Sequence, residues 1–193
     1  METALSIALG IGLSAAAGFR VFVPLLALSI AGYADVLHLA PGFAWIGTIP
    51  AIVAFGTATV LEIAAYYIPW VDNALDTIAA PAAVVAGTVI SASVITDLPP
   101  LIRWTFALIG GGGIAGLLQG ATAFLRLKST ALTAGMGNPV LATAELGGSV
   151  GTVILSLLLP VVAAALMLLL GAGAFFMARR ILFGRRVPAR RPD

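Results

Sequence analysis

Long apolar runs constrain this chain more than any other feature of its sequence. Residues 77–96, 104–125 and 146–178 contain no charged residue. Each run has at least the ~20 residues that a helix needs to cross a hydrocarbon core of ~30 Å. Only 9% of the 193 residues are charged, whereas a soluble domain has about a quarter. The sequence therefore predicts an all-α, polytopic integral membrane protein and excludes a soluble enzyme.

Residue types that serve covalent and metal chemistry are scarce. The chain has no cysteine and a single histidine, His38. This excludes a disulfide framework, a thiolate metal site and a cysteine nucleophile. We expect no metal, no cofactor and no enzymatic activity.

Most of the basic residues follow the last long apolar run. Six of the ten Lys and Arg residues are Arg179, Arg180, Arg185, Arg186, Arg190 and Arg191. Such a cluster next to a membrane segment binds an anionic leaflet and helps to orient the chain. We predict one transmembrane domain over residues 1–182, a basic cytoplasmic tail over 183–193, and no nucleic-acid partner.

Glycine, proline and charge divide the chain into about six membrane elements. The predicted elements cover residues 3–32, 50–69, 81–96, 101–127, 129–148 and 149–181. A short amphipathic helix over 70–80 is expected to lie in the interface, because its apolar and acidic residues fall on opposite faces. Pro160 is expected to kink the last element.

The distribution of Lys and Arg predicts the orientation. If each element crosses once, both termini lie on one side, together with Arg126 and Lys128. That side then holds eight Lys and Arg residues, and the other side holds only Arg103. Because loops rich in Lys and Arg stay in the cytoplasm, we predict that both termini are cytoplasmic.

Several polar residues lie within predicted membrane elements: Arg20, Glu62, Gln119, Asn138 and Glu145. An ionised group at membrane depth costs at least ~2.5–3.5 kcal/mol on insertion scales, so it needs a partner or a function. One interpretation is a polar site for a small solute, an ion or a lipid head group. The alternative is a buried pair between Arg20 and a carboxylate that only locks helices together.

Two aspartates, Asp72 and Asp76, are spaced to share one helix face. They could bind a cation at the cytoplasmic mouth of a pathway. The alternative is that they form the wet side of the interfacial helix.

Glycine and proline also interrupt two predicted elements, at 18–24 and at 135–139. Unwound backbone at membrane depth must be buried or must line a cavity. Paired interruptions in the two halves of a chain are typical of transporter sites. We therefore expect two broken or re-entrant segments, with a weak internal repeat.

Three glycines at four-residue spacing, Gly112, Gly116 and Gly120, predict a helix-packing face, because small residues let helices approach closely. The same stripe suits a homo-oligomer or packing within one chain.

These motifs resemble a known family. The run 18–25 (GFRVFVPL), the stretch from Leu61-Glu62 to Asp76, and Gly137-Asn138-Pro139 with Glu145 and Pro160 are similar to the bacterial membrane family of domain of unknown function 4126. The resemblance covers about residues 4–182. It implies a small integral protein of the bacterial inner membrane and brings no known activity.

A shorter resemblance concerns residues 18–25 alone. They are similar to the arginine-containing break in a re-entrant segment of the DedA-type membrane proteins, which resemble lipid transporters. In that family the motif comes late in the chain, and the arginine pairs with carboxylates on another re-entrant segment. The resemblance implies such a role for Glu62 or Glu145 toward Arg20.

The leading functional hypothesis is a small secondary transporter or flippase in the lipid bilayer, with Arg20 as an anion contact and Glu62 or Glu145 as a proton or cation relay. The alternative is a non-catalytic membrane scaffold or assembly partner that uses its helix-packing faces for docking.

Overall fold

The computed structural model describes residues 2–68 and 71–183, and these residues form helices without a β-strand. In chain order the helices are α1 (Glu2–Ala17), α2 (Phe22–Tyr33), α3 (Ile49–Ala65), α4 (Val71–Val94), α5 (Pro100–Phe106), α6 (Gly113–Thr133), α7 (Asn138–Leu158) and α8 (Pro160–Phe183), with the short η1 (Ala44–Gly47) and η2 (Ala107–Gly112). The predicted basic tail lies outside the described residues, except for its first residue.

Four stretches are long and apolar enough to cross a membrane: Ala74–Val94, Pro100–Thr133, Asn138–Leu158 and Pro160–Arg180. The helical fold is confirmed, and the length and composition of these helices support the predicted membrane class. The described chain has seven helices when α5, η2 and α6 are taken as one. The count of six elements is therefore not confirmed.

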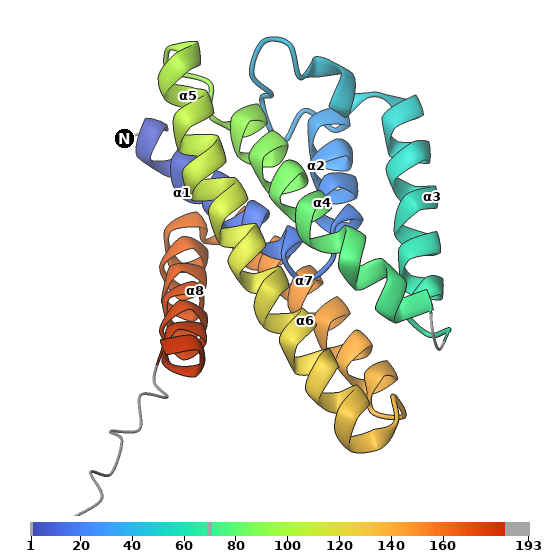
Figure 1. Cartoon of the computed structure of the whole chain (residues 1–193). Coiled ribbons are helices and arrows are strands. Elements are labelled where there is room, and N and C mark those ends of the chain that lie inside the picture. Colours follow the sequence, from blue (N-terminus) through green and yellow to red (C-terminus); the bar gives the residue numbers. More distant parts are fainter. Residues whose placement is uncertain (1, 69–70, 184–193) are drawn as a thin grey trace, which may run out of the picture.

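The first two helices form a hairpin whose tip is the link 18–21. Hydrogen bonds place both of its outer ends beside the end of α4: Oγ1 of Thr3 donates to Oδ2 of Asp97 at 3.5 Å, and the amide of Ala40 donates to the carbonyl oxygen of Ser93 at 2.7 Å. Figure 1 shows α1 running into the molecule and α2 running back. With 16 and 12 residues, neither helix reaches the ~20 residues of a full crossing.

A close approach to α6 explains the glycine at this tip. A Cβ atom on Gly18 would lie 2.6 Å from the carbonyl oxygen of Ala115 and 2.7 Å from Cβ of Leu118. No side chain fits there. The tip of the hairpin is thus held against α6.

Residues 71–94 form the single helix α4, with Pro81 inside it. The prediction of a separate interfacial helix over 70–80 is therefore wrong. Proline removes one hydrogen bond from a helix, but α4 continues through Pro81 as one helix. It packs on α1 and η2.

The helices α5, η2 and α6 continue one another over residues 100–133. The π-helical η2 packs closely on α4. A Cβ atom on Gly111 would lie 2.6 Å from the carbonyl oxygen of Gly87, and one on Gly87 would lie 2.7 Å from the carbonyl oxygen of Gly111. The two backbones therefore touch where neither has a side chain, as small residues permit in membrane helices.

Residues 134–137 form the turn between α6 and α7, and the Asn-Pro pair that follows opens α7. Ala134 and Gly135 have left-handed φ angles of 52° and 87°, and α7 starts at Asn138 with Pro139 in its first turn, where proline is tolerated. Figure 1 shows α7 running back beside α6. The predicted broken element over 129–148 is wrong, and the internal repeat loses its second interruption.

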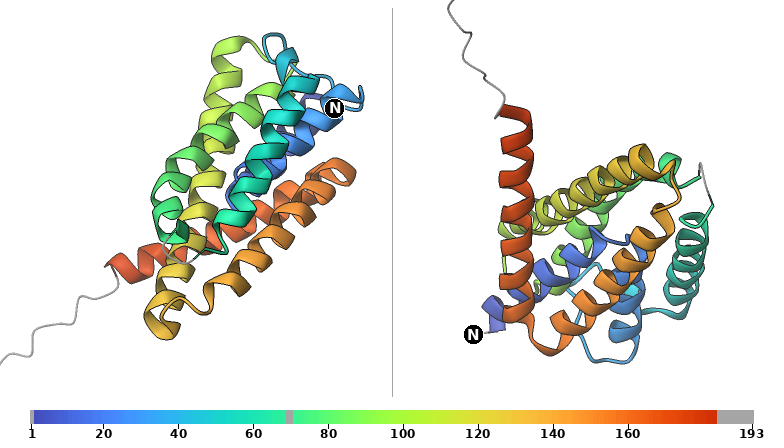
Figure 2. Two further views of the ribbon diagram at one scale, coloured as in Figure 1. Left: turned by 90° about the vertical axis from the view of Figure 1, so that its right-hand side faces the viewer. Right: turned by 90° about the horizontal axis from the view of Figure 1, so that it is seen from below.

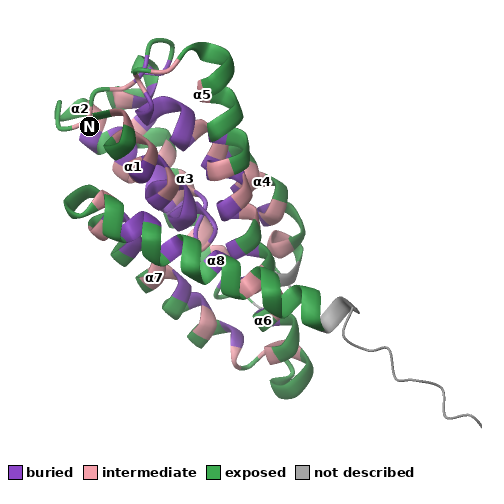
Figure 3. Cartoon of the chain, turned by 90° about the vertical axis from the view of Figure 1, so that its left-hand side faces the viewer, coloured by how far each residue is buried: buried purple, intermediate pink, exposed green. Residues whose placement is uncertain are grey.

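Helices α7 and α8 are separate helices that reverse direction at Pro160, so the prediction of one kinked element over 149–181 is also wrong. Oγ1 of Thr152 lies 3.8 Å from Sδ of Met167, fifteen residues later. In one straight helix residues at that spacing are about 22 Å apart. Figure 3 shows the two helices side by side, joined at one end.

The hairpin formed by α7 and α8 packs on the hairpin formed by α1 and α2. Helix α1 contacts α4, α7 and α8, and its Leu13 is fully buried. Figure 3 shows α1 largely buried and α8 largely exposed, and the right-hand view of Figure 2 shows α8 at the margin of the molecule. The core of the protein therefore surrounds α1, and the tip of its hairpin lies deep in the structure.

Candidate functional site

Arg20 lies at the tip of the first hairpin, and its side chain is 1% exposed. Its Nη2 atom donates to the carbonyl oxygen of Ala142 in α7 at 2.8 Å. The same atom lies 3.6 Å from Oε2 of Glu145. Because a guanidinium stays charged at ordinary pH, Arg20 brings a permanent positive charge into the interior, and α7 faces it.

Arg126 of α6 is a second buried arginine, 2% exposed. Its Nε donates to Oε1 of Glu145 at 3.0 Å, and its Nη2 pairs with Oε2 of the same carboxylate. Its Nη1 lies 3.7 Å from Oδ1 of Asp76 in α4. The bidentate contact makes Arg126 the principal partner of Glu145.

Arg126 is not among the predicted site residues, because its charge was assigned to the region outside the membrane. A signal was present in the spacing. Gln119, Thr122 and Arg126 share one face of a helix, since they follow the i, i+3, i+7 pattern. All three are buried in the structure.

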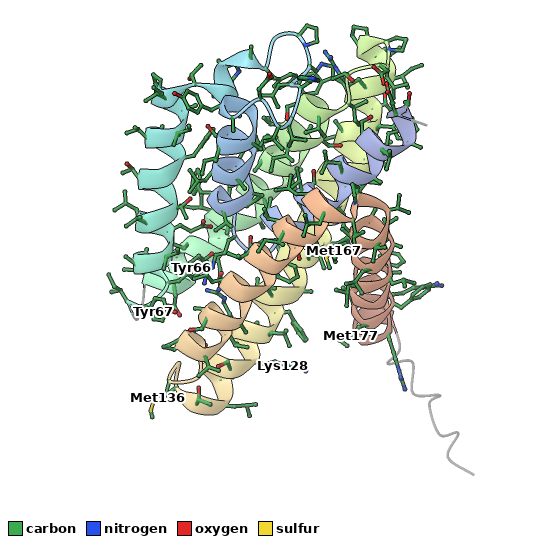
Figure 4. The ribbon with its side chains drawn as sticks, turned by 180° about the vertical axis from the view of Figure 1, so that it is seen from behind. Tyr66, Tyr67, Lys128, Met136, Met167 and Met177 are labelled. Carbon is green, nitrogen blue, oxygen red and sulfur yellow. The ribbon has the colours of Figure 1, made fainter. Side chains whose placement is uncertain are left out.

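Tyr66, just after α3, joins the two arginines and was also missed. The ring centroid lies 3.9 Å from Cζ of Arg20 and 3.9 Å from Cζ of Arg126. Its hydroxyl donates to Oδ1 of Asp76 at 3.5 Å. Figure 4 shows Tyr66 between the foot of α3 and the paired helices α6 and α7. An aromatic face attracts cations, so Tyr66 stabilises both guanidinium groups.

Glu62 of α3 binds the backbone of the hairpin tip. Its Oε1 accepts the amide of Val21 at 2.8 Å, and its Oε2 accepts the amide of Phe22 at 3.1 Å. These amides open α2, where a helix has free N–H groups and a partial positive charge. The structure shows no direct contact between Glu62 and Arg20, so the expected pairing with Arg20 belongs to Glu145.

The two aspartates of α4 point inward. Asp72 is buried, and its Oδ2 accepts a hydrogen bond from Nδ2 of Asn138 at 2.7 Å. Asn138 also donates to Oγ1 of Thr130 at 3.0 Å. Asp76 contacts Arg126 as described. The interpretation of these aspartates as the wet side of an interfacial helix is therefore wrong, and Asn138 joins the cluster through Asp72.

The remaining predicted residues lie elsewhere. Gln119 is buried two turns before Arg126 and is not among the residues that contact the cluster. Gly112 and Gly116 pack on α4, where a Cβ atom would meet Val84 within 3.3 Å and 2.8 Å respectively. A Cβ atom on Gly120 would meet nothing within 4 Å, so the stripe serves packing within the chain at two of its three positions.

The cluster is rich in charge. Its acids are Glu62, Asp72, Asp76 and Glu145, and its bases are Arg20 and Arg126, which gives a formal sum of −2 if all are ionised. Among the described residues no group of three His, Asp or Glu side chains is placed to hold a metal ion. The arrangement can bind charged groups and exchange protons.

The fold and the site define a helical membrane protein with a buried cluster of ionisable side chains at a hairpin tip. The chain belongs to the family described as Domain of unknown function (DUF4126), which matches residues 7–180. No curated protein and no solved structure matches the chain. The comparisons give no support to a relationship with the DedA-type proteins.

Proposed function

We propose that this protein is a small secondary transporter or flippase of the bacterial inner membrane, and that the cluster around Arg20 is its polar site for a solute, an ion or a lipid head group. The observation that carries the proposal is the position of Arg20. It lies at the tip of a hairpin of two short apolar helices and meets side chains from α3 and α7. Charges at such depth are costly and mark transport pathways in membrane proteins.

The two hairpins support this proposal. We take α1–α2, whose helices are too short for a full crossing, as a re-entrant hairpin that packs on the longer helices α7 and α8. Movement of this hairpin would expose the cluster to one side. Glu62 ties the first hairpin to α3, and Glu145 ties it to α6 and α7. Alternating exposure of such a site is the general mode of secondary transporters.

The surplus of acids supports proton coupling. Four carboxylates against two arginines leave negative charge that proton binding would neutralise, and we assign the relay to Glu62 or Glu145. The cluster binds and exchanges charged groups in this proposal, and it catalyses no covalent step.

The scaffold alternative has less support. It relied on the glycine stripe and the interfacial helix as docking faces. Gly112 and Gly116 are used against α4 within the chain, and the supposed interfacial helix is the start of α4 with its aspartates turned inward.

Reconstitution in proteoliposomes tests the transport proposal. Proton-coupled flux is followed with a pH-sensitive dye across a panel of solutes, and lipid flipping is followed with fluorescent phospholipids. Arg20→Lys should reduce the flux at least tenfold, because lysine keeps the charge and loses the planar fork. Lys128→Gln, which removes an exposed charge from the same protein, is the matched control and should leave flux unchanged. Absence of any flux in the wild type, or equal flux in Arg20→Lys, would contradict the proposal.

A further inference from the structure

We propose that Arg20 binds an oxyanion, free in solution or part of a lipid head group, through the guanidinium nitrogens that the protein leaves without an acceptor. This inference rests on the proposed function, because it names the chemical class that the same site would take.

Arg20 has hydrogen-bond donors that no acceptor of the described residues meets. A guanidinium carries five N–H donors, one on Nε and two on each Nη. In Arg20 the Nη2 atom reaches the carbonyl oxygen of Ala142, while Nε and Nη1 are buried and have no hydrogen-bond partner among the described residues. Three donors of a permanently charged group are thus unmet in a side chain that is 1% exposed.

The nearby acids do not fill this need. Glu145 is held through both carboxylate oxygens by Arg126, and its distance of 3.6 Å from Arg20 exceeds a hydrogen bond. Glu62 accepts two backbone amides of the hairpin tip. Asp76 lies beside Arg126, 3.7 Å from its Nη1. Each acid therefore has another donor, and Arg20 is left with donors in excess.

Arg126 provides an internal comparison within the same cluster. Its Nε and Nη2 atoms grip the two oxygens of one carboxylate, as a planar guanidinium prefers. Both arginines lie against the same Tyr66 ring, but only Arg126 has a carboxylate in its fork. An oxyanion of a bound molecule would give Arg20 the contact that Glu145 gives Arg126.

An oxyanion fits these donors better than other ligands. Phosphate and carboxylate groups present several acceptor oxygens and a negative charge, and their hydrogen bonds to a guanidinium are charge-assisted and short. A neutral polar solute would meet the donors too, but its hydrogen bonds would lack the charge assistance that an oxyanion brings. We therefore assign Arg126 to holding the fold and Arg20 to holding the ligand.

Ligand-dependent stabilisation of the purified full chain in an uncharged detergent tests the inference. The midpoint of thermal unfolding is titrated with sodium phosphate, with sodium acetate and with dioctanoyl phosphatidylglycerol. Sodium chloride at equal ionic strength and dioctanoylglycerol, which lacks the phosphate, are the reference ligands. A ligand that binds the folded state raises this midpoint in a saturable way. The proteins compared are wild type, Arg20→Lys, Arg20→Gln and the control Lys128→Gln.

We expect a saturable rise of the midpoint in wild type and Lys128→Gln, at least tenfold weaker binding in Arg20→Lys, and none in Arg20→Gln. Saturation by phosphate or acetate would identify a free anion, and saturation by phosphatidylglycerol alone would identify a lipid head group. If Arg20→Gln fails to fold, Arg20→Lys decides, because it keeps the charge.

No saturable response to any probe in the wild type would overturn the inference, as would an unchanged response in Arg20→Lys. Failure of the transport proposal can be distinguished from failure of this inference. Binding that depends on Arg20, without any flux, would contradict the transport proposal and support the oxyanion site. Flux without binding that depends on Arg20 would contradict the oxyanion site and support transport.

Discussion

At the residue scale, the two buried arginines have different surroundings and should respond differently to substitution. Arg126 is matched to Glu145 through two contacts, so its removal leaves this buried carboxylate with only the longer contact to Arg20. Arg20 has one hydrogen bond, to a carbonyl oxygen, and a carboxylate 3.6 Å away. The guanidinium group of Arg126 therefore stabilises the fold, whereas that of Arg20 keeps donors available for a ligand.

Arg126→Gln should destabilise the protein by about 3–5 kcal/mol, the typical cost of breaking a buried ion pair from one side. Thermal or denaturant unfolding in detergent measures this loss. The double variant Arg126→Met with Glu145→Met should recover most of the stability, because it removes both charges together. Lys128→Gln should change stability by less than about 0.5 kcal/mol. A similar small effect for Arg126→Gln would show that the pair does not support the fold.

Glu62→Ala should loosen the hairpin tip. Hydrogen bonds to a charged group contribute about 1.5–3 kcal/mol, and Glu62 accepts two of them, from Val21 and Phe22. Faster hydrogen exchange of these two amides is the expected result. Glu62→Gln keeps one acceptor oxygen and should show an intermediate effect. Unchanged exchange in Glu62→Ala would mean that the tip is held by packing alone.

At the element scale, the glycines of η2 and α6 differ in what surrounds them. Gly111 touches the backbone of α4 at Gly87, and Gly120 faces open space. Regular spacing in the sequence indicated the stripe Gly112, Gly116 and Gly120, but spacing alone does not say which face meets a neighbour. The closest approach to a neighbouring backbone on this continuous helix involves Gly111, which lies outside that stripe.

Gly111→Leu should therefore prevent normal folding or cost at least about 1–3 kcal/mol, the range for overpacked cores. Gly120→Leu is the matched control on the same continuous helix and should be tolerated. Yield, elution volume and thermal unfolding of the two variants provide the comparison. Equal damage by both would show that Gly120 also meets a neighbour, such as a second copy of the chain.

Element boundaries were predicted unevenly for a physical reason. The apolar runs identified α4, α6, α7 and α8 as helical because composition alone makes them stable in a bilayer. The reversal at Pro160 could not be predicted from these runs, because the apolar composition continues from α7 into α8. A proline is compatible both with a kink and with the start of a new helix. Gly135 to Pro139 likewise fits an internal break or a turn between helices, and only packing of α7 on α6 decided between them.

At the scale of the whole molecule, the described residues form seven helices that reverse direction from one to the next. The start of α1 and the end of α8 therefore lie at opposite ends (Figure 1). The charge-based prediction placed both termini in the cytoplasm on a count of six elements. An odd number of reversing helices predicts that the start of α1 and the end of α8 lie on opposite sides of the membrane. We expect the end of α8 on the cytoplasmic side, near Lys128.

Cysteine accessibility tests this arrangement directly, because the chain has no cysteine of its own. Val36→Cys and Lys128→Cys are exposed positions at the two ends of the described structure. We expect a membrane-impermeant maleimide applied to intact cells to label only Val36→Cys, and inverted vesicles to show the reverse. Labelling of both from one side would contradict the arrangement.

The sequence by itself determined the class of this protein and most of its ionisable site. Apolar runs longer than a bilayer and the scarcity of charge required membrane helices, and Arg20, Glu62 and Glu145 were conspicuous because charge at that depth is costly. Only the tertiary structure decided which of these groups meet. The pairing of Glu145 with Arg126, the position of Tyr66 beside both arginines and the inward turn of Asp72 and Asp76 depend on how α3, α4, α6 and α7 pack. Contacts between residues distant in sequence leave no local pattern, since each helix specifies its own apolar face but not its neighbour.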